Sequence, residues 1–211
     1  MTLEIPKLST PVNSLADLNA AFDGLNENAL ACFPWETPAN KPAVNFKVAH
    51  NNESIFLSYR VQEDEVLARF SKHNSPVYTD SCVEFFVSFE GDKNYYNFEF
   101  NSLGTCLAAY GPDRHQRQSI APETLGLIQT QTSLNRVQGQ SHRFDWQLVI
   151  QLPISVLTNS KISSLSGLKA RANFYKCGDD LTTPHYISWN NIGTSNPDFH
   201  QPPYFGEIEF L

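Results

Sequence analysis

The stretch that decides the fold is residues 82–101, which read CVEFFVSFEGDKNYYNFEFN. Apolar side chains occupy every second position in both halves: Val83, Phe85, Val87 and Phe89, then Tyr96, Phe98 and Phe100. Successive side chains of a strand point to opposite faces of a sheet, so this period of two predicts two half-buried strands. The turn-forming run Gly91-Asp92-Lys93-Asn94 between them predicts a connection across which the strands pair.

The second face of this strand pair is polar. It carries the side chains of Tyr95, Glu84, Asn97, Glu99 and Asn101. If the strands pair across the turn, we expect Glu84 and Glu99 to share this surface, while the apolar face meets a core that includes Trp146. Sugar rings stack their C–H groups on aromatic faces, and their hydroxyls bond carboxylates and amides, so this surface suits a sugar.

Further strands are expected on both sides of this pair. They cover residues 44–48, 55–61, 105–110, 127–133, 144–151, 168–177 and 205–211. Asn51-Asn52-Glu53 predicts a hairpin turn, and Pro, Gly and Asn separate most of the other strands. Many short strands with such turns indicate an all-β fold, an antiparallel β-sandwich that is jelly-roll-like, rather than βαβ units.

The N-terminal part is different in character. Five prolines fall within residues 1–42, and Leu15, Leu18, Phe22 and Leu25 are at helical spacing in a short helix expected over residues 14–25. We expect one domain over residues 1–211, with 1–42 as a lead-in segment packed on a sandwich of 43–211. Residues 152–157 predict one helical turn, and 111–124 predict a polar loop rich in Arg, Gln and Pro.

Charge and composition exclude several classes of partner. The formal net charge is −7 and the 15 Lys and Arg form no run, so we expect no nucleic-acid partner. The apolar stretches are far shorter than the roughly 18 residues that a membrane helix needs. Residues 1–7 lack the basic and apolar regions of a secretory signal. The expected localisation is therefore the bacterial cytoplasm or, if a signal was removed, the periplasm or the cell surface. Oligomeric state has no signature in the sequence.

Metal and cofactor signatures are weak. The four cysteines, at 32, 82, 106 and 177, show no C-x-x-C spacing, and the six histidines are scattered. We therefore expect neither a disulfide nor a transition-metal centre. Met1 is the only methionine, so a haem with Met and His as axial ligands would have no plausible methionine ligand. No cofactor is expected from these residues alone.

Three segments together resemble the family 9 carbohydrate-binding modules, especially the stand-alone bacterial proteins of polysaccharide-using species. They are Asp80 to Phe86, Tyr96 to Gly104, and Ile187-Ser188-Trp189 followed by Phe199 to Gly206. The resemblance covers Val44 to the C-terminus with the segments in the right order. It implies a β-sandwich that clamps a sugar between two aromatic rings, with a Glu, an Asn and an Arg on its hydroxyls. It also implies a structural calcium in many members.

The resemblance assigns roles to individual residues. Tyr78 and Phe199 fall at the two ring positions, where well-studied members carry Trp, Glu84 at the binding Glu and Asn196 at the binding Asn. The position of the binding Arg falls on Glu99, which is a departure from the family. With Asn101 and His200 added, the candidate ligand-binding residues are Tyr78, Glu84, Glu99, Asn101, Asn196, Phe199 and His200.

Three functions remain open at this point. Non-catalytic binding of a mono- or oligosaccharide is the main expectation. A carbohydrate hydrolase using Glu84 and Glu99 is an alternative, because paired carboxylates serve glycoside hydrolysis, although the sequence lacks known catalytic signatures. A protein-interaction domain on a diverged sandwich is the other alternative.

Overall fold

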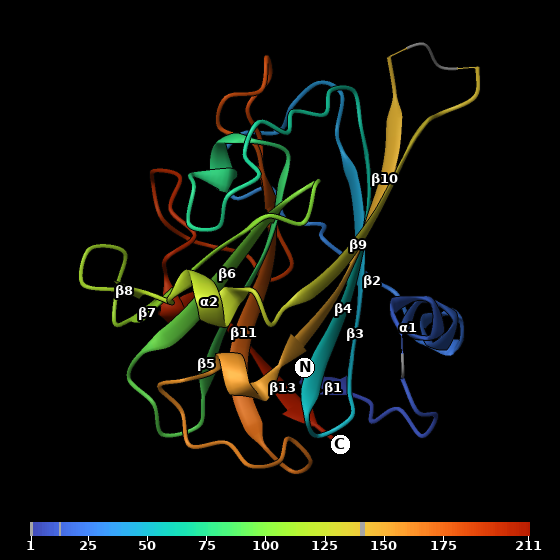
Figure 1. The fold of residues 1–211 in the computed structure, drawn as a ribbon. Helices are drawn as coiled ribbons and strands as arrows, with labels where there is room; N and C mark the ends of the chain where they lie inside the picture. The colour runs from blue at the N-terminus through green and yellow to red at the C-terminus, as the bar shows by residue number, and fades with distance from the viewer. Residues whose placement is uncertain (1, 13, 140–141) are drawn as a thin grey trace.

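The structure is a computed structural model that describes residues 2–12, 14–139 and 142–211. In these residues thirteen strands form two facing sheets (Figure 1). The larger sheet has the order β1 (Leu3–Ile5), β13 (Gly206–Phe210), β11 (Lys169–Cys177), β5 (Cys82–Phe89), β6 (Tyr95–Asn101), β7 (Cys106–Gly111) and β8 (Gln118–Ser119), with β12 (Tyr186–Ser188) also beside β11. The smaller sheet has the order β2 (Asn28–Ala29), β3 (Ala43–His50), β4 (Ser54–Glu63), β10 (Phe144–Pro153) and β9 (Gln129–Arg136). The fold is the expected jelly-roll-like β-sandwich.

The strand pair that opens the sequence forms as predicted. β5 and β6 are antiparallel, with Glu84 opposite Glu99 and Phe85 opposite Phe98. The residues expected in the core are all in the main hydrophobic cluster between the sheets: Val83, Phe85, Val87, Tyr96, Phe98, Phe100 and Trp146. The alternation in the sequence therefore sets the register correctly, because a slip of one residue would exchange the two faces.

One end of this core contains a buried ion pair. The Lys176 ammonium lies 2.8 Å from Oε2 of Glu63 and also donates to Nε2 of His185 at 2.9 Å. The other oxygen of Glu63 accepts a 2.7 Å hydrogen bond from the Trp146 indole. Because an ammonium only donates, His185 accepts at Nε2, and its Nδ1–H faces the Thr183 carbonyl. Burial and the lysine charge lower the pKa of His185 to about 3.

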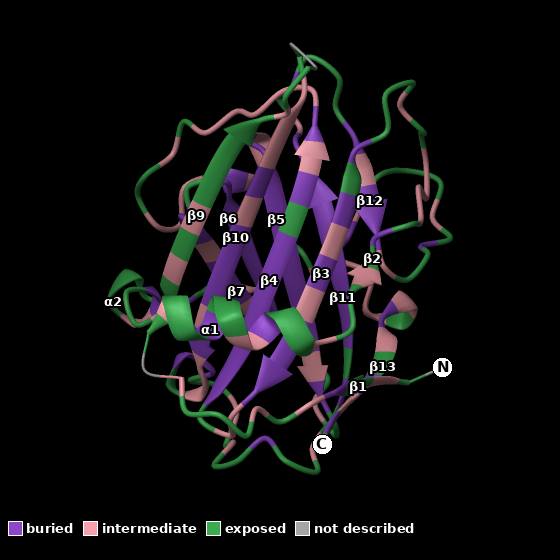
Figure 2. Cartoon of the chain, turned by 90° about the vertical axis from the view of Figure 1, so that its right-hand side faces the viewer, coloured by how far each residue is buried: buried purple, intermediate pink, exposed green. Residues whose placement is uncertain are grey.

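The N-terminal segment contributes to both sheets. β1 pairs in parallel with β13, and β2 pairs with β3. Helix α1 (Leu15–Ala21) begins after Ser14, whose hydroxyl accepts the Asp17 N–H as an N-cap, and continues into a 3-10 turn, η1 (Phe22–Gly24). It lies across the outer face of the smaller sheet (Figure 2), where Leu18 and Phe22 pack in a small cluster with Phe56. The expected lead-in is thus a helix that covers one sheet, together with two added strands.

The outer face of the larger sheet is covered by loops. A second hydrophobic cluster lies there, made of residues from β5, β6 and β11 and of loop residues: Val77, Cys82, Phe86, Tyr95, Tyr175, Cys177, Ile192, Phe199 and Phe205. The sequence predicts a polar surface on this face, but Glu84 and Glu99 are only 3% and 2% exposed. The loops that follow β4, β7 and β12 fold back over the sheet and bury these carboxyl groups.

Smaller differences concern the connections. The loop expected over residues 111–124 includes the short strand β8 and a helix, α2 (Pro122–Leu125). Two further 3-10 turns are η3 (Ile154–Val156), as predicted, and η4 (Pro202–Tyr204). None of the helices in the described residues has the length and apolar character needed to cross a membrane.

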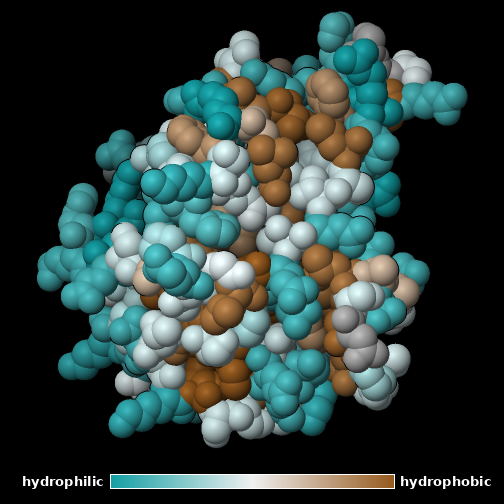
Figure 3. Space-filling model, viewed as in Figure 1, coloured by the Kyte–Doolittle hydropathy of each residue, from teal (hydrophilic) through white to brown (hydrophobic). Residues whose placement is uncertain are grey.

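The described residues expose few large apolar side chains. On the face seen in Figure 3, hydrophobic residues form several separate groups between hydrophilic ones. The large hydrophobic residues that are most exposed are Leu103, Leu127, Leu134 and Leu211, which come from different parts of the chain. Cavities are therefore a better guide to function here than one broad apolar face.

Candidate functional site

A cavity of about 260 Å³ opens over the outer face of the larger sheet. Its floor comes from β5, β6 and β11, and its walls come from the 3-10 turn η2 (Val77–Thr79), the loop before β8 and the loop after β12. The last two loops lie side by side at the left of Figure 1. The lining residues are Tyr78, Glu84, Glu99, Arg114, His115, Arg117, Cys177, Asp179, Tyr186, Pro197, Asp198, Phe199 and His200.

The floor carries two carboxyl groups on neighbouring strands. Oε1 of Glu84 accepts from the thiols of Cys177 at 3.1 Å and Cys82 at 3.9 Å. Oε1 of Glu99 accepts from the Asn97 amide at 3.0 Å, while its Oε2 has no hydrogen-bond partner among the described residues. Burial raises the pKa of Glu84 well above its usual range and that of Glu99 to about 7. A buried oxygen without a partner next to a cavity is a natural acceptor for a ligand hydroxyl.

A guanidinium group lies directly beside these acids. Nη1 of Arg117 is 3.6 Å from Oε1 of Glu99 and donates to Nε2 of His200 at 2.9 Å. Because a guanidinium has no acceptor, the His200 ring is neutral and its Nδ1–H faces the Tyr95 hydroxyl at 2.8 Å. Burial and the neighbouring arginines lower the pKa of His200 to about 2. His200 therefore holds Arg117 in position and carries no charge itself.

Three aromatic rings border the cavity. Phe199 is stacked on Tyr175, with ring centroids 4.1 Å apart and an interplanar angle of 9°, and is only 8% exposed. Tyr186 meets Phe199 at 6.0 Å in an edge-on arrangement, and Tyr78 is half-buried on another wall. The family resemblance assigns Phe199 to one of the two rings that clamp the sugar, but Tyr175 covers one of its faces. The exposed aromatic surface is shared mainly by Tyr78 and Tyr186.

Five of the seven predicted residues line this cavity: Tyr78, Glu84, Glu99, Phe199 and His200. Asn101 lies outside it and is buried, with its amide donating to Oδ2 of Asp80 and its oxygen accepting two turn N–H groups. Asn196 also lies outside it and is exposed, and its carbonyl accepts from the Thr194 hydroxyl. Neither side chain reaches the floor, because each belongs to a turn at the end of a loop or strand.

The sequence did not single out several lining residues. Arg114, Arg117, Asp179 and Asp198 join the site from loops, and Tyr186 joins it from β12, at positions far apart in the chain. The only available signal was the high Arg content of residues 111–124, which could not show where that loop packs.

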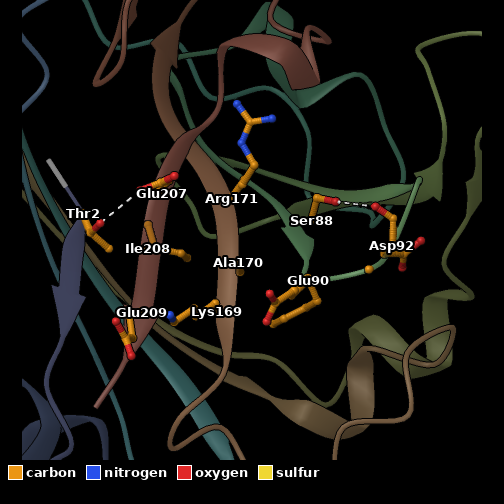
Figure 4. A pocket seen from close by; sticks show the side chains of 12 residues that line it. Thr2, Ser88, Glu90, Asp92, Lys169, Ala170, Arg171, Glu207, Ile208 and Glu209 are labelled. Carbon is orange, nitrogen blue, oxygen red and sulfur yellow. Dashed lines mark hydrogen bonds between the residues drawn. The ribbon is translucent and has the colours of Figure 1, made fainter.

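A second cavity, of about 380 Å³, lies at the outer ends of β5, β11 and β13 (Figure 4). Two of its charged side chains are held by neighbouring groups. Glu207 accepts from the Thr2 hydroxyl, and Arg171 donates to the carbonyls of Pro203 and Phe205. Phe89 is its only aromatic lining residue, and it contains none of the predicted site residues. The cavity between β5, β6 and β11 is therefore the better candidate site.

The chain is an all-β sandwich of two sheets, and its larger sheet carries a polar cavity bordered by aromatic rings. The family model described as carbohydrate-binding family 9 matches residues 16–210, and the chain belongs to that family.

Solved structures agree with this family assignment. A protein from Bacteroides uniformis ATCC 8492, provisionally described as carbohydrate-binding, shares 35% identity over 100% of this chain and 99% of its own, with a TM-score of 0.90. A family 9 module from Caldicellulosiruptor kristjanssonii in complex with glucose shares 14% identity over 100% of this chain and 96% of its own, with a TM-score of 0.62. The same module in complex with cellotriose gives the same identity and TM-score, over 93% of its own chain. No curated protein gave a significant match.

Proposed function

We propose that this chain binds a mono- or oligosaccharide, without cleaving it, in the cavity between β5, β6 and β11. The observation that carries the proposal is the Arg117 guanidinium 3.6 Å from Glu99, whose other carboxyl oxygen, Oε2, has no hydrogen-bond partner within the described part of the chain. Donors and acceptors placed together in this way match a sugar, whose hydroxyl groups both donate and accept. The family 9 structures with glucose and cellotriose support a carbohydrate ligand.

We infer that Arg117 takes the part of the binding arginine that the family resemblance implies. Glu99 stands where the family resemblance implies a binding arginine, which would leave the site without its guanidinium. In this fold the loop before β8 brings the Arg117 guanidinium within 3.6 Å of the Glu99 carboxyl group. We infer that Arg117 and Glu99 act together on the hydroxyls of the sugar, with Glu84 beside them.

The aromatic rings supply the apolar part of the contact. Tyr78 and Tyr186 offer faces to the C–H groups of a sugar ring, and the mostly buried Phe199 supports the wall behind Tyr186. Such stacking contributes on the order of 1 kcal/mol per ring. Each ring therefore changes the Kd for the sugar by only about fivefold, since 1.4 kcal/mol is a factor of ten.

A hydrolase mechanism fits these carboxyl groups less well. A retaining or inverting glycosidase needs one protonated and one ionised carboxyl group. Here Oε1 of Glu84 is engaged by the thiols of Cys177 and Cys82 beneath the floor, and the Arg117 guanidinium lies beside Glu99. We therefore place binding ahead of catalysis.

Isothermal titration with glucose and with cellotriose, carried to millimolar ligand, tests the proposal. The wild type should bind one ligand per chain, and chromatography of the mixture should show intact sugar. Arg117→Gln should weaken binding at least tenfold, since charge-assisted hydrogen bonds contribute about 1.5–3 kcal/mol. Arg143→Gln is the matched control, because Arg143 pairs with Asp64 outside the cavity. The absence of binding to any neutral sugar, or an equal loss in both variants, would overturn the proposal.

A further inference from the structure

Two cysteines and a carboxylate meet beneath the floor of the sugar cavity. Cys82 on β5 lies directly opposite Cys177 on β11, and Glu84 follows two positions along β5 on the same face. Their Sγ and Oε atoms all lie within 4.8 Å of one another. All three residues are buried, and neither cysteine is in a disulfide.

The spacing of these atoms suits a tetrahedral metal ion. Zn²⁺ binds thiolate sulfur at about 2.3 Å and carboxylate oxygen at about 2.0 Å, so a tetrahedral angle puts sulfur and oxygen about 3.5 Å apart. The two measured distances from Oε1 of Glu84 are 3.1 Å to Cys177 and 3.9 Å to Cys82. Small side-chain rotations would equalise them. The same geometry puts the two sulfurs about 3.8 Å apart, within the limit of the cluster.

We propose that Cys82, Cys177 and Glu84 bind a thiophilic divalent cation of the zinc class beneath the sugar cavity. This reverses the expectation from the sequence, in which cysteine spacing gives no metal signature. Ligands that are brought together by strand register leave no such signature, because 94 residues separate Cys82 from Cys177 along the chain.

The local charge also favours a cation at this point. Glu84 takes part in none of the ion pairs formed by the described residues, and the one guanidinium paired with the floor acids contacts Glu99 instead. Glu99 retains a buried oxygen, Oε2, that has no hydrogen-bond partner in the described parts of the chain. Glu84 and Glu99 are two neighbouring buried carboxyl groups, and only Glu99 is paired with a cation in the described residues. A second positive charge can therefore be accommodated beside Glu84.

The site has an entry path and a consistent proton balance. Cys177 and Glu84 both line the cavity, so an ion can reach them from solvent. On binding, the two thiol protons leave to solvent as two metal–sulfur bonds form. Glu84, whose pKa is raised by burial, also releases its proton to solvent, and its carboxylate supplies the third ligand. A water molecule from the cavity would supply the fourth ligand of a tetrahedral ion. Two sulfur ligands favour Zn²⁺ or Cd²⁺ over Ca²⁺, which prefers six or more oxygens.

The test uses the full chain, reduced with a phosphine and stripped with a chelator. Titration with Cd²⁺ should produce the ultraviolet thiolate-to-metal charge-transfer band and saturate at one ion per chain. Zn²⁺, followed by competition with a chromophoric chelator, should bind the same site. Cys82→Ser and Cys177→Ser should each abolish the band and weaken Zn²⁺ binding at least about 100-fold.

Cys106→Ser is the matched control. Cys106 is also fully buried in the larger sheet, but it faces the core between the sheets and is not part of the cluster. This variant should keep both the band and the affinity. X-ray absorption of the Zn²⁺-loaded wild type, which needs no variant to fold, should show two sulfur neighbours at about 2.3 Å.

Three outcomes would overturn the proposal: a titration without the band, a spectrum with no sulfur neighbours, or a band that survives in Cys82→Ser. The metal is titrated without sugar, and sugar binding is measured in the presence of chelator. Failure of the metal site and failure of the sugar site are therefore distinguishable.

Discussion

Phe199 lies flat against Tyr175, with ring centroids 4.1 Å apart and only 9° between the ring planes. Tyr175 is completely buried, and its hydroxyl donates to the Phe199 carbonyl at 3.1 Å. The loop after β12 is therefore anchored to β11 by both the ring and the backbone carbonyl of Phe199. A ring at this position supports the wall of the cavity as much as it contacts a ligand.

The first prediction concerns this anchoring. Phe199→Ala should lower the free energy of unfolding by about 3 kcal/mol, because it empties a packed position in the second hydrophobic cluster. Tyr78→Ala should cost about 1 kcal/mol or less, since that ring is half-buried and faces the cavity. Urea denaturation of both variants checks the contrast, and equal losses would show that the two rings have the same role.

The second prediction concerns pH. Burial raises the pKa of Glu99 from 4.5 to about 7, so between these values the folded state binds more protons than the unfolded state. The stabilisation from this group is thus fully present below pH 4.5 and is lost as the pH rises through 7. Glu99→Gln imitates the protonated form. Its stability relative to the wild type should therefore rise with pH across this window, by up to about 1.4 kcal/mol per unit.

Thermal unfolding of wild type and Glu99→Gln in buffers from pH 5 to 8 measures this difference. Glu123→Gln changes an exposed carboxyl group, so its stability should depend on pH in the same way as that of the wild type. A constant offset between Glu99→Gln and wild type at every pH would refute the assignment to Glu99.

The third prediction concerns the buried ion pair. Lys176→Met leaves Glu63 in the core without its cation and should destabilise the fold by about 3–5 kcal/mol. The double variant Lys176→Met/Glu63→Gln should recover part of that loss, because no uncompensated charge remains. Lys169→Met, at an exposed position of the same strand, is the control. Chemical denaturation gives all four values, and a double variant less stable than the single one would contradict this reading.

The fourth prediction concerns a glycine in β13. A Cβ added to Gly206 would lie 2.6 Å from Cζ3 of the Trp189 ring, which is too close for any carbon contact. Gly206→Ala should therefore cost about 1–3 kcal/mol through forced movement of that ring. Gly24→Ala, where the added atom meets nothing within 4 Å, should stay within about 0.5 kcal/mol of the wild type. Tryptophan fluorescence during denaturation reports both.

Local alternation was enough to predict much of the fold. The strands at residues 82–89 and 95–101, their register and the residues they bury follow from a period of two that each strand carries by itself. The helix near the N-terminus was also predictable, because its spacing and its Ser14 cap are local. The extra strands β1 and β2 were not, since segments of two or three residues have too little pattern to show which sheet they join.

The sequence by itself determined that Glu84 and Glu99 share a face, because neighbouring strands joined by a short turn must pair. Only the tertiary structure decided that loops cover this face, that Arg117 reaches Glu99 and that Cys82 meets Cys177. Those contacts join residues between 18 and 95 positions apart, and the paths of the loops and the order of the strands set them. Such paths depend on the packing of the whole chain, which no local pattern encodes.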